Sequence, residues 1–193
     1  MTKPIDDELA HGLLMRCAKQ DEQALGELHA LLARRVYAFA FNRLRDPTLA
    51  ETVVIDTLYE VWKSAAKFRG DSKVSTWVLG ICRYKILELR REIGPDHDDI
   101  ESYSETMPSE LENAEERLSR WQEEQAVHRC MTTLSAAHRE CMQLVYFEGL
   151  SLVEIAHIQN VPENTVKTRL FHARKLMRHC VEAQHSSSKR EVP

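Results

Sequence analysis

Apolar side chains recur at every third or fourth position along most of the chain, which is the spacing of helices that bury one face. In the first half, short polar breaks separate four such runs, over about residues 5–18, 23–44, 48–67 and 74–93. The pattern returns near Trp121 and predicts a helix that continues past Leu134, another over 136–148 and a closing pair. Helix formers dominate and the first half lacks strand alternation, so we expect an all-α protein.

The middle of the chain has a different composition. Residues 96–120 are rich in Asp, Glu and Ser and poor in apolar side chains, so this stretch cannot form a core of its own. We therefore predict two small helical domains, a helical bundle over 5–93 and a second domain over 121–182. An acidic, flexible linker over 94–120 joins them, and a disordered tail over 183–193 follows.

Residues 149–176 read as two short helices joined by a tight turn. Ser151 and Glu154 have the spacing of a capping box. Asn160 suits a left-handed turn position, and Pro162 suits the first position of a new helix. This layout is typical of a helix-turn-helix, whose second helix lies in a DNA major groove. The alternative is an ordinary helical hairpin with a solvated basic face.

Charge is segregated along the chain. The formal net charge is -4, yet residues 167–178 are strongly basic and residues 96–116 strongly acidic. Short polar groups at the start of the second helix can reach base edges, and its cations can reach phosphates or guanine. The candidate DNA-contacting residues of this helix are Asn164, Thr165, Lys167, Thr168, Arg169, His172 and Arg174.

The cysteines suggest no redox or metal chemistry. Five of them are scattered without a C-x-x-C pair, and an odd number argues against a disulfide framework, so we expect three or four buried reduced thiols. The alternative is a zinc or redox site built from Cys130, Cys141 and either His179 or Cys180.

Other functional classes find little support. No phosphate loop, nucleophile elbow or H-E-x-x-H motif occurs, so we expect neither an enzyme nor a cofactor. No run approaches the roughly 20 apolar residues of a membrane span. The N-terminus lacks the apolar core of a signal peptide, so we expect a cytoplasmic protein without membrane insertion.

Several short motifs, taken in order, resemble bacterial RNA polymerase sigma factors of the extracytoplasmic-function type, in the sigma-70 family. Residues 35–47 and 50–62 look like the start of region 2 of that family. Residues 67–70 and 75–78 are similar to its promoter-melting segment. Residues 134–139 and 145–176 look like region 4.

The resemblance implies a protein that binds core RNA polymerase and directs transcription initiation. Region 4 would read the minus-thirty-five element as duplex, and region 2 would open the minus-ten element and hold a single strand. For Trp77 the alternative to contact with an unpaired base is packing in the core. For Phe68 the alternative is that it anchors its loop. The candidate minus-ten residues are Phe68, Arg69, Lys73, Trp77, Arg83, Tyr84 and Lys85.

The resemblance also implies that the helix over 50–62 contacts a coiled coil of the largest polymerase subunit. It implies that region 4 contacts the beta flap of the polymerase. The candidate polymerase-binding residues are Glu51, Thr52, Ile55, Asp56, Tyr59 and Glu60. Many relatives have a carboxylate at the position of Thr52 and Gln at that of Ile55, so this face is less acidic than the family pattern.

Phosphorylation of Thr52, or less favourably of Thr57, by a Ser/Thr kinase would restore the missing charge. The alternatives are that Thr52 is simply tolerated, or that an anti-sigma factor clamps both domains. The acidic linker is either a passive tether or a mimic of nucleic acid inside the polymerase. A stand-alone helix-turn-helix regulator is the competing function; a receiver domain would alternate strands and helices, which residues 23–93 do not.

Overall fold

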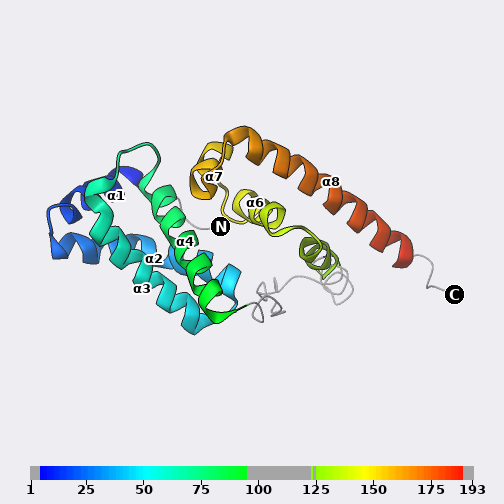
Figure 1. The fold of residues 1–193 in the computed structure, drawn as a ribbon, viewed down its shortest axis with the longest axis horizontal. Helices are drawn as coiled ribbons and strands as arrows, with labels where there is room; N and C mark the ends of the chain where they lie inside the picture. Colours follow the sequence, from blue (N-terminus) through cyan, green and yellow to red (C-terminus); the bar gives the residue numbers. More distant parts are fainter. Residues whose placement is uncertain (1–4, 95–122, 124, 189–193) are drawn as a thin grey trace, which may run out of the picture. The chain divides into compact units, whose positions relative to one another are not determined.

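The computed structural model describes residues 5–94, 123 and 125–188, and the ordered elements in these ranges are all helices (Figure 1). The chain divides into two compact units. The first contains α1–α4, and the second contains α6, most of α7 and α8. The all-α prediction is confirmed. Within the described ranges, no helix is long and apolar enough to cross a membrane.

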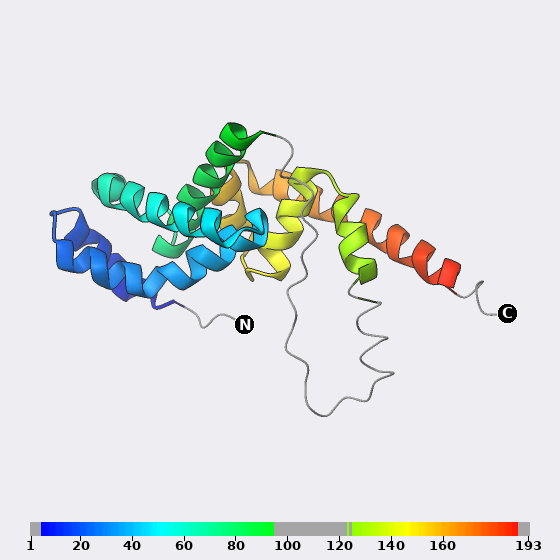
Figure 2. The same ribbon diagram turned by 90° about the horizontal axis from the view of Figure 1, so that it is seen from below.

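The helices of the first unit lie where the four apolar runs predict them, and the blue-to-green part of the ribbon in Figure 2 draws these helices. Its elements are α1 (Asp7–Cys17), α2 (Glu22–Leu44), α3 (Pro47–Ser64) with the 3₁₀ turn η1 (Ala65–Lys67), and α4 (Val74–Ile93). Asp6, Asp21 and Asp46 cap the first three helices with their carboxylates. Asp46 Oδ1 accepts the backbone N–H of Leu49 at 2.9 Å, because Pro47 is already helical.

Helix α2 is the centre of this unit and packs against α1, α3 and α4. It buries Leu28, Leu32, Val36 and Phe39, each at most 1 % exposed. The guanidinium of Arg43 lies 3.5 Å from the Phe39 ring centroid, so the aromatic face is covered by a cation. The body of this unit is therefore a conventional apolar core, which carries the exposed faces of α3 and α4.

The second unit starts with a helical segment over 125–132, followed by α6 (Ala136–Tyr146), α7 (Leu152–Gln159) and α8 (Glu163–Ser188). Arg139 ties the turn before α6 together, because its guanidinium donates to the carbonyls of Met131, Thr132 and Leu134. Helix α8 packs along α6, and α8 is longer than expected. The predicted disordered tail is wrong up to Ser188, because α8 continues to that residue. Residues 189–193 and nearly all of the predicted linker lie outside the described residues.

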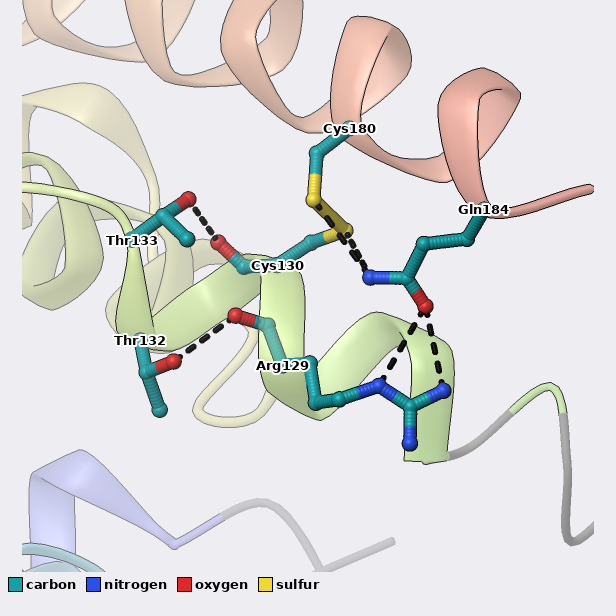
Figure 3. Close-up of a disulfide and its surroundings, with 6 residues drawn as sticks. All are labelled: Arg129, Cys130, Thr132, Thr133, Cys180 and Gln184. Atoms are coloured by element: carbon teal, nitrogen blue, oxygen red, sulfur yellow. Dashed lines mark hydrogen bonds between the residues drawn. A yellow bond between two sulfur atoms is a disulfide. The ribbon is translucent and has the colours of Figure 1, made fainter. Parts of the chain in front are cut away.

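Two of the five cysteines contradict the argument against a disulfide. Cys130 and Cys180 form a disulfide between the segment over 125–132 and α8 (Figure 3). The side-chain amide of Gln184 donates to Cys130 Sγ at 3.2 Å and accepts from Arg129 Nη2 at 3.1 Å. The two cysteines are 50 positions apart, and only the packing of the two helices brings them together.

The remaining cysteines behave as the sequence suggests. Cys17, Cys82 and Cys141 are buried free thiols. Burial raises the pKa of the Cys17 thiol, so it stays protonated at neutral pH. These side chains therefore contribute to the packing of the two cores.

Candidate functional site

The helix-turn-helix forms as the capping motif predicts. The N–H and the hydroxyl of Ser151 both donate to Glu154 Oε2, at 2.9 and 2.7 Å, and the N–H of Glu154 donates back to Ser151 Oγ at 3.3 Å. These reciprocal bonds satisfy backbone donors that the first turn of α7 would leave unpaired. The capping box is thus present and sets where α7 begins.

The turn itself rests on one left-handed residue. Asn160 has φ of 52°, a conformation that asparagine adopts more easily than most side chains. The N–H of Val161 reaches back to the carbonyl of Ala156 at 3.1 Å. The carbonyl of Pro162 accepts the N–H of Thr165 at 2.9 Å, so α8 starts at Glu163, one residue later than predicted.

Helix α8 buries Val166, Leu170 and Ala173, which are at most 2 % exposed, and turns its opposite side outward. The predicted DNA-contacting residues divide accordingly. Thr165 and Arg169 are half-buried. The exposed ones are Asn164, Lys167, Thr168, His172 and Arg174.

Several of these side chains already have partners on the protein. Lys167 Nζ pairs with Glu163 Oε1 at 2.8 Å, and the Thr168 hydroxyl donates to the carbonyl of Asn164 at 2.9 Å. Arg174 Nε donates to the hydroxyl of Tyr146 at 3.1 Å, which orients the guanidinium. The outward face of α8 is therefore partly pre-organised.

Sequence reasoning missed the apolar component of this face. Phe171 is 66 % exposed and lies one turn from both Thr168 and Lys175 on the outward side of α8. A shallow depression on this surface includes Phe171, Arg174 and Arg178 among its lining residues. A helical projection of α8 would have found Phe171, because it falls opposite the buried positions.

In the first unit, the loop between η1 and α4 carries the predicted melting residues. Arg69 has an 83 % exposed side chain and pairs with Asp71 at 3.0 Å, and Gly70 has φ of 77°. Phe68 packs against Trp77, with ring centroids 5.2 Å apart and an interplanar angle of 57°. Both rings are half-buried, so Phe68 anchors its loop while part of its surface remains accessible.

The later members of the predicted minus-ten set lie along α4. Tyr84 is 54 % exposed, whereas Arg83 is half-buried. Lys85 Nζ lies 3.0 Å from Glu88 Oε2, and this hydrogen bond raises the pKa of Lys85, with smaller contributions from the charges of Glu60 and Asp56. Its ammonium therefore already has a carboxylate partner in Glu88 on the same helix, which lowers its value as a phosphate ligand. Lys73, in the loop before α4, is exposed.

The predicted polymerase-binding residues share one face of α3. Ile55 and Tyr59, one turn apart, are 68 % and 61 % exposed. The acidic members Glu51 and Asp56 flank them and are exposed, while Glu60 is half-buried. An apolar stripe with acidic edges is the composition of a protein-docking surface rather than of a solvated helix.

The two candidate phosphorylation sites differ completely. Thr52 is exposed on this α3 face, and its hydroxyl donates to the carbonyl of Thr48 at 3.0 Å. Thr57 is 0 % exposed, so a kinase could not reach its hydroxyl in the folded domain. The proposal of Thr57 as a secondary site is therefore wrong, because position 57 turns into the core.

Comparison with known proteins assigns the family. A sequence model of sigma-70 region 2 matches residues 28–94, and one of sigma-70 region 4 matches residues 124–177. The chain is a sigma-70 family member of the extracytoplasmic-function type. Similar proteins include the ECF RNA polymerase sigma factor SigK of Mycobacterium bovis, 24 % identical over 172 residues, covering 88 % of this chain and 92 % of the relative. SigK of Mycobacterium sp. strain JLS is 25 % identical over 173 residues, with 88 % and 89 % covered.

Solved structures support the fold of this sigma factor. CnrH, solved in complex with the cytosolic domain of CnrY, has a TM-score of 0.63 at 21 % identity, covering 91 % of this chain and 98 % of that one. The sigma factor RpoE of Bartonella quintana, solved with the anti-sigma factor NepR, has a TM-score of 0.59 at 24 % identity, with 81 % and 96 % covered.

Membership of this family identifies a transcription initiation factor rather than an enzyme. The region 2 match also argues against the stand-alone regulator, which would need only the helix-turn-helix. The matched ranges leave out, among other parts of the chain, α1 and Cys180. Helix α1 precedes region 2, and Cys180 follows region 4.

Proposed function

We propose that this sigma factor binds core RNA polymerase through α3, holds the minus-thirty-five element through α8, and opens the minus-ten element with the loop over 68–73. The observation that carries the proposal is the pairing of both family regions on one chain, each with an exposed surface suited to its task. The residues of the domains over 5–93 and 121–182 then have distinct roles.

For the polymerase, the docking surface is the α3 face centred on Ile55 and Tyr59. Burial of such exposed side chains supplies the hydrophobic part of an interface. Glu51 and Asp56 add negative charge at the edge, which steers association with a basic partner. The coiled coil of the largest subunit is the partner that the family implies for this face, and the beta flap is the one for region 4.

For promoter DNA, α8 supplies cations and short polar groups on one outward face. Asn164 and Thr168 are near its N-terminus, where a recognition helix reaches base edges. Lys167 and Arg174 are exposed cations on the same face that would contact phosphates. In region 2, the accessible part of Phe68 offers a stacking surface for an unpaired base, worth about 1–3 kcal/mol. Arg69 next to it suits a backbone phosphate.

Control through Thr52 deepens this proposal. A phosphate at this position would place about -1.5 to -2 charges in the middle of the α3 docking face, where Glu51 and Asp56 are its exposed acidic neighbours. The face would then approach the acidic pattern of the family. A second candidate is an anti-sigma factor that covers this face. The solved complex of RpoE with NepR is the observation in its favour.

The first test is transcription in vitro with purified core polymerase and a library of genomic promoters. The chain is expected to co-purify with core polymerase and to bind free promoter duplex poorly. With core polymerase it is expected to initiate transcripts from a defined subset of the library. Absence of both association and selective initiation would contradict the proposal.

The second test separates the modes of control. Thr52→Asp is expected to bind core polymerase more tightly than Thr52→Ala. Gln23→Glu, at an exposed position of α2, serves as a control for added charge elsewhere in the same domain. Binding is measured by titration of labelled sigma factor with core polymerase. Equal affinity of Thr52→Asp and Thr52→Ala would remove the phosphorylation hypothesis and leave the anti-sigma factor.

A further inference from the structure

Three aromatic rings from separate elements meet beside the melting loop. His11 is on α1, Phe68 is at the start of the loop and Trp77 is on α4. The ring centroids of His11 and Phe68 are 6.0 Å apart with an interplanar angle of 58°, and those of Phe68 and Trp77 are 5.2 Å apart at 57°. Phe68 is therefore the middle member, and both contacts have the tilted geometry that aromatic pairs prefer.

The loop itself has little regular structure to hold Phe68. Residues 68–73 follow the 3₁₀ turn and contain Gly70 in a left-handed conformation. The ion pair between Arg69 and Asp71 is internal to the loop and largely exposed, so it anchors nothing to the helices. The orientation of the Phe68 ring thus depends on the rings that it contacts.

Helix α1, which carries the His11 ring, is well packed against the rest of the unit. It buries Ala10, Leu13 and Leu14 at 4 % exposure or less, and it packs against α2, α4 and η1. Asp6 caps its first turn, accepting the N–H groups of Glu8 and Leu9. His11 is exposed, so packing of the core does not account for its ring.

Helix α1 lies before residue 28, where the match to region 2 begins, so the family match attaches no role to it. We propose that His11 is a positioning residue for promoter opening, holding the Phe68 ring in the orientation in which an unpaired base stacks on it. Helix α1 then belongs to the melting apparatus. This inference rests on the proposed function.

The experiment is a double-mutant cycle on promoter opening, using the full-length chain with core polymerase. The variants are His11→Ala, Phe68→Ala and the double variant, and opening is followed by permanganate reactivity of unpaired thymines. One aromatic contact is lost, so His11→Ala is expected to slow opening about two- to tenfold. The double variant is expected to open no more slowly than Phe68→Ala, because His11 acts through Phe68.

Three controls separate positioning from a general loss of structure. His11→Tyr keeps a ring at the position and is expected to restore opening. His29→Ala removes an exposed histidine from α2 and is expected to behave as wild type. Affinity for core polymerase is expected to be the same for all variants, since α3 is untouched.

The inference is overturned if His11→Ala opens promoters at the wild-type rate, if its effect adds fully to that of Phe68→Ala, or if Phe68→Ala itself has no effect. The wild-type chain is the reference for the proposed function. If wild type fails to initiate at promoters, the proposed function fails. If wild type initiates and Phe68→Ala slows opening, either of the first two results overturns the inference alone. If Phe68→Ala has no effect, the stacking role proposed for Phe68 fails together with the inference.

Discussion

Regions 2 and 4 of this sigma factor present their candidate functional groups in different ways. Region 4 displays them on one helix, α8, whose outward face follows from helical periodicity alone. The first unit assembles them from α3, the loop over 68–73 and α4 of region 2, together with α1, which precedes that region. A duplex can be read by one rigid helix inserted in a groove, whereas capture of an unpaired base needs groups converging from several elements.

The two regions are also stabilised differently. Region 2 packs its other helices around α2, which buries large side chains such as Phe39 and Leu32. Region 4 adds a covalent link, Cys130–Cys180, between its first helical segment and the later part of α8. Independent perturbation of the two should therefore affect separate unfolding transitions.

The largest effect is expected from Phe39→Ala in region 2. Removal of a fully buried ring leaves a cavity and should lower the free energy of unfolding of region 2 by about 3–5 kcal/mol. Differential scanning calorimetry should show a lower midpoint for the region 2 transition and an unchanged one for region 4. Equal shifts in both transitions would show that the regions do not unfold separately.

The second-largest effect on stability is expected in region 4. Replacing both Cys130 and Cys180 by serine opens a loop of 50 positions and should lower the free energy of unfolding of region 4 by about 2–4 kcal/mol. Chemical denaturation of the wild-type protein with and without dithiothreitol provides the comparison. Reductant should destabilise wild type and leave the double variant unchanged; equal sensitivity of both would argue against this disulfide.

A smaller effect is expected for Lys167→Ala on α8. Loss of one phosphate contact should weaken binding of the polymerase complex to minus-thirty-five duplexes of any sequence, and should reduce the slope of log affinity against log salt by about one. Fluorescence anisotropy over a salt series measures both quantities. An unchanged slope would mean that Lys167 stays paired with Glu163 in the complex.

The smallest effect concerns the acid limb of region 2 stability. Hydrogen bonds from Arg16 and from the N–H of Ala24 lower the pKa of Asp21. Because the folded pKa lies below the unfolded one, the carboxylate contributes stability above the usual aspartate range and loses it as pH falls through the folded pKa. Asp21→Asn should therefore lower the region 2 midpoint slightly at neutral pH, and the difference should vanish in acid.

Much of the fold followed from local patterns. The runs of apolar residues predicted α1–α4 because helical amphipathicity repeats within a few residues. Ser151, Glu154 and Asn160 predicted the entry and turn of the helix-turn-helix for the same reason. The tail was misjudged because its polar composition gave no sign that α8 continues to Ser188.

The sequence alone determined the helical class, the order of the helices, the capping box and the family resemblance, because each depends on residues close together in the chain. Only the tertiary structure decided that Cys130 meets Cys180, that Thr57 is buried while Thr52 is exposed, and that His11 reaches Phe68. These facts depend on how helices rotate and pack against one another. Such packing is a property of the whole core, and no short stretch of sequence specifies it.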